Sequence, residues 1–351
     1  RPFRDRHLHQ VPALFRMIAG TEKGKSMVNI LMLSKWHVHA KDYANMVKAQ
    51  PDAKITCVWD EEAARGQAWA QELGAAFEPD LDKALARADV DAVVVDTPTA
   101  DHKRVILKAA KAKKHIFTEK VLATTMADCR EIAQAINENG VKFCISFPRL
   151  TWPLTQLCRK AIDEGSLGRV HYMRMRVAHD GALRGWLPDY WYDKDLAGGG
   201  AMMDLGCHPM YIASYLLGKP MRISSVFNNT CAPGGVDDNA VSVVEFENKA
   251  IAVLETGFVG SIGGEMFELL GTQGAIVQVG KDLKMRTGKF DGGWYIPDKL
   301  PEQQAPALRQ WLDGIINGTP IPFDLEKALA LTELLENAYQ SDKEQKIIAI
   351  K

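Results

Sequence analysis

Apolar runs alternate with amphipathic stretches through the first half of the chain, and this alternation constrains the fold more than any other feature. The clearest run is Asp-Ala-Val-Val-Val-Asp at 91–96, where successive valines direct side chains to both faces of a strand. A strand that is apolar on both faces is typical of a parallel sheet covered by helices on each side. The pattern therefore predicts a doubly wound α/β domain over residues 27–147.

The other segments of this region continue the alternation. Strands are expected at 28–33, 54–60, 114–118 and 141–147, and helices at 40–50, 61–73, 81–87, 101–112 and 126–139. Gly74 and Gly140 follow two of these helices, at the position where glycine commonly ends a helix. We therefore expect the strands to lie in one parallel sheet.

The pattern changes beyond Pro148. Helices are expected at 154–164, 198–217, 306–316 and 325–341, and strands at 169–178, 221–227, 240–246, 250–258, 266–271 and 275–279. Most of these strands are short and are separated by Gly, Asn and Asp, which is typical of antiparallel sheets. Residues 148–351 are therefore predicted to form an α+β domain with a large, mostly antiparallel open sheet.

Composition and charge restrict the class of partner. Of the 351 residues, 46% are hydrophobic and 25% are charged, which fits a globular protein of two domains. The net charge of -1 favours neither nucleic acid nor an anionic membrane as partner. The six cysteines include no Cys-x-x-Cys pair, and no apolar run reaches the ~20 residues of a membrane helix. We therefore expect a cytoplasmic protein with a small-molecule ligand.

Residues 1–26 differ from the rest of the chain. The segment begins Arg-Pro-Phe-Arg-Asp-Arg, is basic and carries no strand pattern, whereas Met27 stands directly before the first apolar strand. We interpret 1–26 as an N-terminal extension that is either foreign to the folded domain or upstream of its true start. An Arg-rich transit segment is the less favoured alternative.

The glycine-led segment 198–208, Gly-Gly-Gly-Ala-Met-Met-Asp-Leu-Gly-Cys-His, carries the strongest chemical signal. Asp204 and His208 are four apart in a predicted helix, so they are expected to share one face, while the glycines would let backbone approach a ligand. Lys120 follows the strand at 114–118. Lysine, aspartate and histidine together suit proton transfer from a hydroxyl. The alternatives are a carboxylate that stabilises a helix N-terminus, an ordinary histidine and a solvated lysine.

The order of these motifs resembles the Gfo/Idh/MocA oxidoreductases, the glucose-fructose oxidoreductase and inositol dehydrogenase family, along nearly all of 27–351. The motifs that carry the resemblance are Val58-Trp59-Asp60, 91–99 followed by His102, Glu119-Lys120, 165–170, 198–208 and Asn317-Gly318-Thr319-Pro320. The resemblance implies a Rossmann domain for a nicotinamide nucleotide. It also implies a second domain whose open sheet often forms the contact of a homodimer or homotetramer.

The resemblance further implies roles for individual residues. Lys120 matches the family's lysine that contacts both cofactor and substrate hydroxyl, and Asp204 and His208 match its aspartate and catalytic histidine. Asp60 matches the position of the family's acidic residue that binds the adenosine ribose, and an acidic residue there favours NAD over NADP. The candidate cofactor-binding residues are Ser34, Trp36, His37, Val38, Asp60, Thr97, Pro98, Thr99, His102, Glu119 and Lys120.

The chain departs from the family at the first strand-to-helix turn. A Rossmann turn uses glycine to bring backbone close to the pyrophosphate, but residues 34–39 are Ser-Lys-Trp-His-Val-His. The tryptophan either blocks the dinucleotide or marks a differently shaped turn. We favour retained binding, because Asp60, the segment 97–99 and Lys120 otherwise have no common purpose. Basic residues of the turn and the helix N-terminus can supply charge for phosphate.

Other side chains are candidates for a metal or a substrate. His37 and His39 are separated by one residue and suit zinc, but no further ligand is evident from the spacing, so we predict no metal. Aromatic residues in 185–193 are expected to form a wall for a sugar ring, with a buried aromatic loop as the alternative. The candidate substrate-binding residues are Lys120, Arg149, Trp152, Trp186, Tyr190, Trp191, Asp204 and His208.

These features predict an NAD-dependent dehydrogenase that acts on a CH–OH group of a sugar, polyol or glycoside. His208 is expected to be the general base, Asp204 to orient it, and Lys120 to stabilise the developing alkoxide. One alternative is an enzyme that oxidises a sugar transiently with tightly held NAD, for elimination, epimerisation or glycoside cleavage. The other is a non-catalytic sugar-sensing relative whose altered turn has lost the nucleotide.

Overall fold

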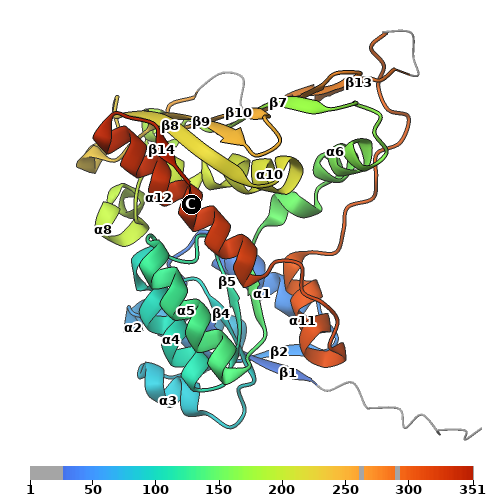
Figure 1. The fold of residues 1–351 in the computed structure, drawn as a ribbon. Coiled ribbons are helices and arrows are strands. Elements are labelled where there is room, and N and C mark those ends of the chain that lie inside the picture. Colours follow the sequence, from blue (N-terminus) through green and yellow to red (C-terminus); the bar gives the residue numbers. More distant parts are fainter. Residues whose placement is uncertain (1–26, 261–264, 289–292, 351) are drawn as a thin grey trace, which may run out of the picture.

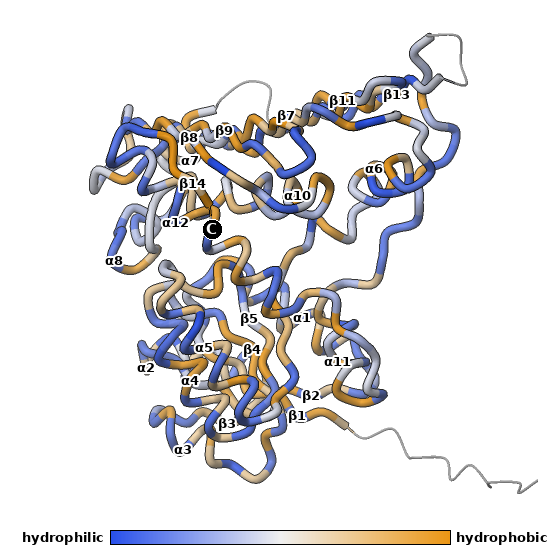
Figure 2. Tube along the Cα trace, in the orientation of Figure 1, coloured by the Kyte–Doolittle hydropathy of each residue, from blue (hydrophilic) through white to orange (hydrophobic). Residues whose placement is uncertain are grey.

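Two sheets, one in each lobe of the molecule, organise the chain (Figure 1). The computed structural model describes residues 27–260, 265–288 and 293–350, so the predicted N-terminal extension lies outside the described residues. Apolar residues run along the strands at the centre of the lower lobe (Figure 2). Each sheet forms the core of its lobe together with the helices that cover it.

The strands of the first sheet are β1 (Val28–Leu33), β2 (Ala53–Trp59), β3 (Ala76–Phe77), β4 (Ala92–Val95), β5 (His115–Thr118) and β6 (Phe143–Ile145). All are parallel, in the order β3-β2-β1-β4-β5-β6. This is the strand order of a doubly wound Rossmann sheet, so the predicted fold class is confirmed here. Every residue of β4 is buried, as the valine run predicted.

The helices of this lobe are α1 (Ala40–Lys48), α2 (Ala63–Leu73), α3 (Leu81–Ala86), α4 (His102–Lys111) and α5 (Met126–Asn139). Local sequence sets the ends of α5. The Thr125 hydroxyl accepts a hydrogen bond from the Asp128 amide at the start, and Gly140 adopts a left-handed conformation at the end. Gly74 ends α2 in the same way, so both predicted helix ends are confirmed.

The strands of the second sheet are β7 (Val170–Ala178), β8 (Pro220–Asn228), β9 (Asn239–Phe246), β10 (Ile251–Gly257), β11 (Met266–Gly271), β12 (Ala275–Val279), β13 (Asp282–Arg286) and β14 (Ile348–Ala349). Their order is β13-β12-β11-β7-β10-β9-β8-β14. Neighbours are antiparallel except for the parallel pair β7 and β10, so the mostly antiparallel open sheet is confirmed. In β9, exposed Val241 and Val243 alternate with buried residues.

The remaining helices are α6 (Pro153–Asp163), α7 (Gly181–Arg184), α8 (Lys194–Ala197), α9 (Ala201–Asp204), α10 (Cys207–Leu217), α11 (Ala307–Asn317) and α12 (Leu325–Glu344), with 3₁₀ turns η1 (Thr99–Asp101), η2 (Pro148–Thr151), η3 (Asp189–Tyr192) and η4 (Pro233–Gly235). α10 and α12 pack against the second sheet. α11 lies instead against β5 and β6 of the first sheet, where Trp311 is buried and Arg309 pairs with Asp52 at 2.7 Å. The boundary near residue 147 stays a prediction.

The expected helix over 198–217 is broken in two. α9 ends at Asp204, and α10 begins at Cys207 after Leu205 and Gly206. A Cβ at Gly206 would lie 2.6 Å from the Met202 carbonyl oxygen, a backbone atom that cannot easily move aside, so glycine permits this close packing of the two helices. The expected continuous helix is therefore interrupted, but Leu205 and Gly206 keep right-handed helical dihedrals, and a shared face of Asp204 and His208 stays a prediction.

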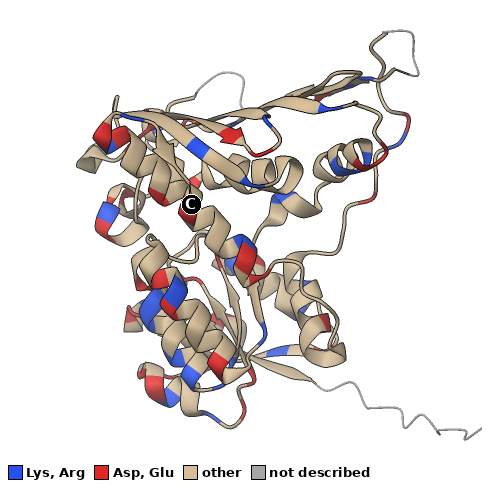
Figure 3. Ribbon diagram, in the orientation of Figure 1, with Lys and Arg blue, Asp and Glu red and all other residues tan. Residues whose placement is uncertain are grey.

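Charged residues of both signs are interspersed over the helices of the two lobes (Figure 3). None of the helices in the described part of the chain is long and apolar enough to cross a membrane.

Candidate active site

The carboxyl ends of neighbouring strands in the first sheet place several predicted residues together. β1 ends before Ser34, β4 before Asp96, and β5 before Glu119. The turn after β1 is tied to the end of β4, because the His37 amide donates to the Asp96 carbonyl at 3.1 Å. Ligands of open parallel sheets bind at this edge, which makes it the candidate site.

Lys120 connects this edge to the second lobe. Its Nζ lies 2.8 Å from Oδ1 and 2.7 Å from the backbone carbonyl of Asp204, and its side chain is 3% exposed. Burial alone would lower the pKa of Lys120, but the Asp204 carboxylate more than offsets this and holds that pKa above its usual value. The lysine is therefore a buried ammonium with one carboxylate partner.

His208 is held by a different partner. Its Nδ1 lies 2.9 Å from the Tyr211 hydroxyl, which also accepts a hydrogen bond from the Arg149 amide at 3.3 Å. Burial lowers the pKa of His208 well below its usual value, and the cations Lys120 and Arg149 lower it further. The ring is therefore neutral at neutral pH. Tyr211, rather than Asp204 as predicted, contacts and orients this histidine.

A buried cluster surrounds Glu119, beside Lys120. The Tyr43 hydroxyl donates to Oε2 of Glu119, and Nδ1 of His39 lies 3.3 Å from the same oxygen. Ligand atoms of His37, His39 and Glu119 all lie within 4.8 Å of one another. Sequence spacing did not reveal Glu119 as a third potential ligand, because it is 80 residues from His39 and reaches it only through the parallel sheet.

The three glycines that lead the motif pack against protein. A Cβ at Gly198, Gly199 or Gly200 would lie 2.1–2.4 Å from Thr124, Tyr339 or Asp237, respectively. The glycines therefore permit close contacts within the protein, which differs from the expected approach to a ligand. The Asp237 carboxylate accepts hydrogen bonds from the amides of Gly200 (3.0 Å) and Met202 (2.7 Å) at the start of α9. Sequence reasoning missed this acceptor, which fixes the helix that ends in Asp204.

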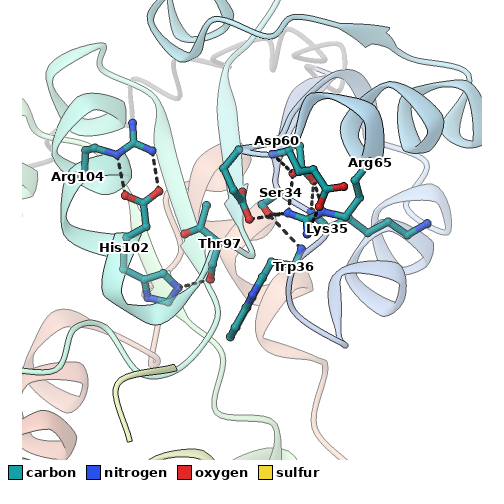
Figure 4. A network of polar contacts seen from close by, with 11 residues as sticks. Ser34, Lys35, Trp36, Asp60, Arg65, Thr97, His102 and Arg104 are labelled. Atoms are coloured by element: carbon teal, nitrogen blue, oxygen red, sulfur yellow. Dashed lines mark hydrogen bonds and ion pairs between the residues drawn. The ribbon is translucent and has the colours of Figure 1, made fainter. Parts of the chain in front are cut away.

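Asp60, the predicted ribose ligand, is fully engaged within the protein (Figure 4). Arg65 binds both carboxylate oxygens, at 2.6 and 3.0 Å, and the amides of Lys35 and Glu62 each donate at 2.8 Å. Arg65 also contacts Glu61 at 2.6 Å and Glu62 at 3.3 Å. The cluster thus holds three carboxylates and one guanidinium, and is negative overall.

The segment 97–99 and His102 are buried beside this edge (Figure 4). Nε2 of His102 lies 3.2 Å from the Thr97 carbonyl, and Nδ1 lies 2.8 Å from the Val121 carbonyl. Burial lowers the pKa of His102, so the neutral ring can donate to only one of the two. Both ring nitrogens face the backbone, and His102 ties segment 97–99 to the residue after Lys120.

The predicted aromatic wall divides into buried and exposed parts. The rings of Tyr190 and Trp191 lie 5.0 and 5.2 Å from the ring of Trp36, so they pack on the glycine-free turn. Trp36 and Trp191 are almost fully buried, whereas Val38 is 51% exposed. Trp186 is 53% exposed and donates its indole N–H to Asp180 at 2.9 Å. The alternative of a buried aromatic loop therefore describes Trp191, and not Trp186.

Arg149 and Trp152 lie together on η2 and its C-terminal end. The guanidinium stacks over the Trp152 ring, 4.5 Å from its centroid, and pairs with Glu265. Both residues line a cavity of about 300 Å³, whose walls include Met175, Ile212, Glu265 and Phe267. Arg149 is also close enough to His208 for its charge to lower the pKa of that histidine.

Two family models match the chain. Residues 37–147 match an oxidoreductase family with an NAD-binding Rossmann fold, and residues 155–277 match the GFO/IDH/MocA C-terminal domain. Among curated proteins, scyllo-inositol 2-dehydrogenase (NAD(+)) of Bacillus subtilis is 30% identical over 312 residues. That alignment covers 84% of this chain and 87% of the relative.

Solved structures share the whole fold. The structure of GenD2 from gentamicin A biosynthesis, in complex with NAD, has a TM-score of 0.80 at 25% identity, covering 98% of this chain and 100% of that one. Levoglucosan dehydrogenase, in complex with NADH and levoglucosan, has a TM-score of 0.83 at 20% identity, with coverages of 93% and 100%. The second likeness concerns the fold alone.

Proposed function

This chain belongs to the Gfo/Idh/MocA family of NAD-binding oxidoreductases, and on that premise we propose that Lys120, Asp204 and His208 oxidise a hydroxyl-bearing carbon of a sugar, polyol or glycoside. The observation that carries the proposal is the buried ion pair of Lys120 and Asp204 at 2.8 Å, next to a neutral histidine. A cation and a base thus lie at the edge of the sheet where such folds bind nucleotide.

Each of the three residues has a separate role in removing the proton from the substrate hydroxyl. The Lys120 ammonium donates to the substrate hydroxyl oxygen and stabilises the negative charge that develops there. The neutral His208 accepts the hydroxyl proton, and Tyr211 holds the imidazole through Nδ1. Asp204 fixes the position of the lysine. When bound, nicotinamide supplies the acceptor for the hydride of the carbinol carbon.

The polar groups at the strand ends fit a dinucleotide. Nε2 of His37, the Asp96 carboxyl and the Thr97 hydroxyl are buried and have no hydrogen-bond partner within the described ranges. Buried polar groups are nearly always hydrogen-bonded, so a polar ligand at this edge would satisfy all three. These residues, with Lys120 and the Asp60 cluster, are therefore proposed to hold the cofactor.

The charge of the Asp60 cluster favours NAD. The 2′-phosphate of NADP would be placed near Asp60, Glu61 and Glu62, whose combined charge exceeds that of Arg65. An additional phosphate is repelled by this surplus of negative charge. Arg65 must release part of its contact with Asp60 before the carboxylate can accept a ribose hydroxyl.

The cavity lined by Arg149 and Trp152 favours a neutral substrate. The charge of Arg149 is compensated by Glu265, so the pair offers little attraction for an acidic sugar. Trp152 is 37% exposed, and aromatic faces stack on the C–H faces of sugar rings. Trp186, more exposed still, is proposed to contact the same ligand from the second lobe.

Assembly and location follow from two other features. We propose a homodimer or homotetramer formed through the open face of the second sheet, where Val226, Val241, Val243 and Ile251 are exposed. All six cysteines are free thiols, and five of them are buried, which supports a location in the reducing cytoplasm.

The direct test incubates the protein with NAD and, in turn, each member of a panel of cyclitols, aldoses and anhydrosugars. Formation of NADH is measured by its nicotinamide absorbance. We expect NADH to accumulate with at least one neutral polyol or sugar, and the rate with NADP to be lower. The proposal fails if NAD binds but no member of the panel yields NADH.

A further inference from the structure

Most of the backbone N–H groups in the glycine-free turn already donate hydrogen bonds within the protein. The amide of Lys35 donates to Asp60 (2.8 Å), that of Trp36 to the Ser34 hydroxyl (3.0 Å), and that of His37 to the Asp96 carbonyl (3.1 Å). In a glycine-rich turn, such amides face the phosphates of the ligand. A phosphate at this turn must therefore be bound mainly by side chains.

His37 offers the first such donor. The amide of His39 donates to Nδ1 of His37 at 3.1 Å, so Nδ1 carries no proton and Nε2 of the neutral ring must carry it. His37 is 4% exposed, and its Nε2 has no hydrogen-bond partner among the residues that the structure describes. Burial holds the pKa of this histidine at about 3, so the ring remains neutral. The result is a buried N–H donor without an acceptor.

Trp191 offers a second donor from the other lobe. Its ring meets the ring of His37 edge to face, with centroids 5.2 Å apart, and the residue is 5% exposed. The indole N–H can only donate, and it too lacks a partner in the described part of the chain. The Tyr190 hydroxyl is near enough for the Trp191 donor to counteract part of the rise in pKa that burial gives Tyr190, but the two side chains do not form a well-aligned hydrogen bond.

The tautomer of His37 argues against a metal as the missing partner. His37, His39 and Glu119 lie close enough to hold a cation, but a metal on Nε2 requires the proton to move to Nδ1, which already accepts the His39 amide. Glu119 is engaged by Tyr43 and His39, and the Lys120 ammonium is its sequence neighbour. The Nε2–H of His37 and the indole N–H of Trp191 are donors, and these two groups call for an acceptor oxygen.

We propose that His37 and Trp191 form a pair of donors, one from each lobe, that closes on the pyrophosphate oxygens of bound NAD. This inference rests on the proposed function. Hydrogen bonds to charged oxygens are stronger than those between neutral groups, so the ligand converts two unsatisfied N–H groups into two favourable contacts. The rings must separate to admit the phosphates, and the pair then holds the lobes together through the ligand.

The test compares Trp191→Phe and His37→Phe with the wild-type protein. Both variants keep an aromatic ring and remove an N–H donor. We expect the affinities for NADH and for ADP-ribose, measured by fluorescence or calorimetry, to fall about tenfold in each variant. Binding of adenosine, which has no phosphate, should not change. His37→Gln, which restores an N–H donor, should recover part of the loss.

Trp69→Phe is the matched control, because Trp69 has a buried indole N–H without a partner in the described residues but belongs to the core of the first lobe. Its nucleotide affinity should equal that of the wild type. The thermal stability of the ligand-free Trp191→Phe protein should be unchanged or higher, since the lost donor made no hydrogen bond.

Two results would overturn the inference while leaving the proposed function intact. One is an affinity for NADH within about twofold of the wild type in both Phe variants. The other is zinc binding that is lost in His37→Phe while nucleotide affinity stays the same. A wild-type protein that binds no NADH would overturn the proposed function as well.

Discussion

The Lys120 ammonium lies 2.8 Å from the Asp204 carboxylate, although 84 positions separate the two residues in the chain. Lys120 follows a strand of the first sheet, and Asp204 ends a short helix of the second lobe. The ion pair is nearly inaccessible to solvent, with side-chain exposures of 3% and 13%. The two lobes thus meet through the charged groups that are proposed to act on substrate.

Replacement of Lys120 by methionine should abolish turnover without abolishing nucleotide binding. The variant keeps the length of the side chain but removes the ammonium, so kcat should fall by about a hundredfold or more. It should also lose about 3 kcal/mol of unfolding free energy, because the Asp204 carboxylate is left buried without its cation.

A double variant separates chemistry from stability. Lys120→Met combined with Asp204→Asn should regain part of the stability and none of the activity, since the unpaired charge is gone. Lys160→Met, at an exposed lysine of α6, is the control and should resemble the wild type. Activity in the double variant would contradict the assignment.

The pH dependence of kcat/KM should report the neutral His208. A base acts only when unprotonated, and the pKa of His208 lies well below 6.5 because the ring is buried near two cations. As pH falls through 6.5, kcat/KM should therefore stay on its plateau and decline only at lower pH. A decline centred at pH 6.5 or above would identify a different base.

Tyr211→Phe should impair His208 specifically. The substitution removes the hydroxyl that contacts Nδ1 at 2.9 Å, so kcat should fall about tenfold while the dissociation constant for NADH stays unchanged. Tyr215→Phe, one turn further along α10, is the matched control. Equal kinetics of the two variants would mean that Tyr211 does not orient the base.

The Asp60 cluster should set the preference between nucleotides. Asp60→Ser removes the carboxylate to which Arg65 donates hydrogen bonds from two nitrogens. The guanidinium can then pair with the 2′-phosphate of NADPH. The ratio of the NADPH to the NADH affinity should rise about tenfold. In Asp60→Ser/Arg65→Ala this gain should disappear, and persistence of the gain would exclude Arg65 as its source.

Replacement by alanine should lower the free energy of unfolding more at Gly200 than at Gly74. A Cβ at Gly200 would lie 2.1 Å from the Asp237 carbonyl, so Gly200→Ala should cost about 3 kcal/mol or prevent folding. Gly74 has a φ of 66° with nothing near a Cβ, and Gly74→Ala should cost only about 1 kcal/mol. Denaturant titration measures both, and equal losses would contradict the packing explanation.

Patterns that are local in sequence predicted the strands and helices of the first sheet well. The valine run of β4 and the glycines after α2 and α5 specify their structures through burial and backbone conformation alone. Those of the second sheet were also largely predicted, apart from β13 and the short β14. The pairing of β14 with β8 depends on the distant end of the chain.

The site was harder to predict, because its decisive contacts are long-range. The roles of Lys120, Asp204 and His208 remain predictions; the sequence suggested that Asp204 contacts His208, whereas the structure pairs it with Lys120. The contact of His208 with Tyr211 could have been suggested by their spacing of three on a helix, whereas Asp60 precedes the helix that carries Arg65. The approach of Glu119 to His39, and of Asp237 to Gly200, depends on tertiary packing that no local pattern specifies.

The return of α11 to the first sheet makes that lobe discontinuous in sequence. The Trp311 ring packs 5.7 Å from that of Phe117 in β5, and the Ile145 amide of β6 donates to the Phe323 carbonyl at 3.0 Å. A fragment cut after residue 147 would expose this apolar surface and lose the hydrogen bond from the Ile145 amide on the outer edge of β6, which would still pair with β5. We therefore expect a fragment that ends at residue 147 to be less stable than the whole chain, because α11 can complete the first lobe only after most of the chain has been synthesised.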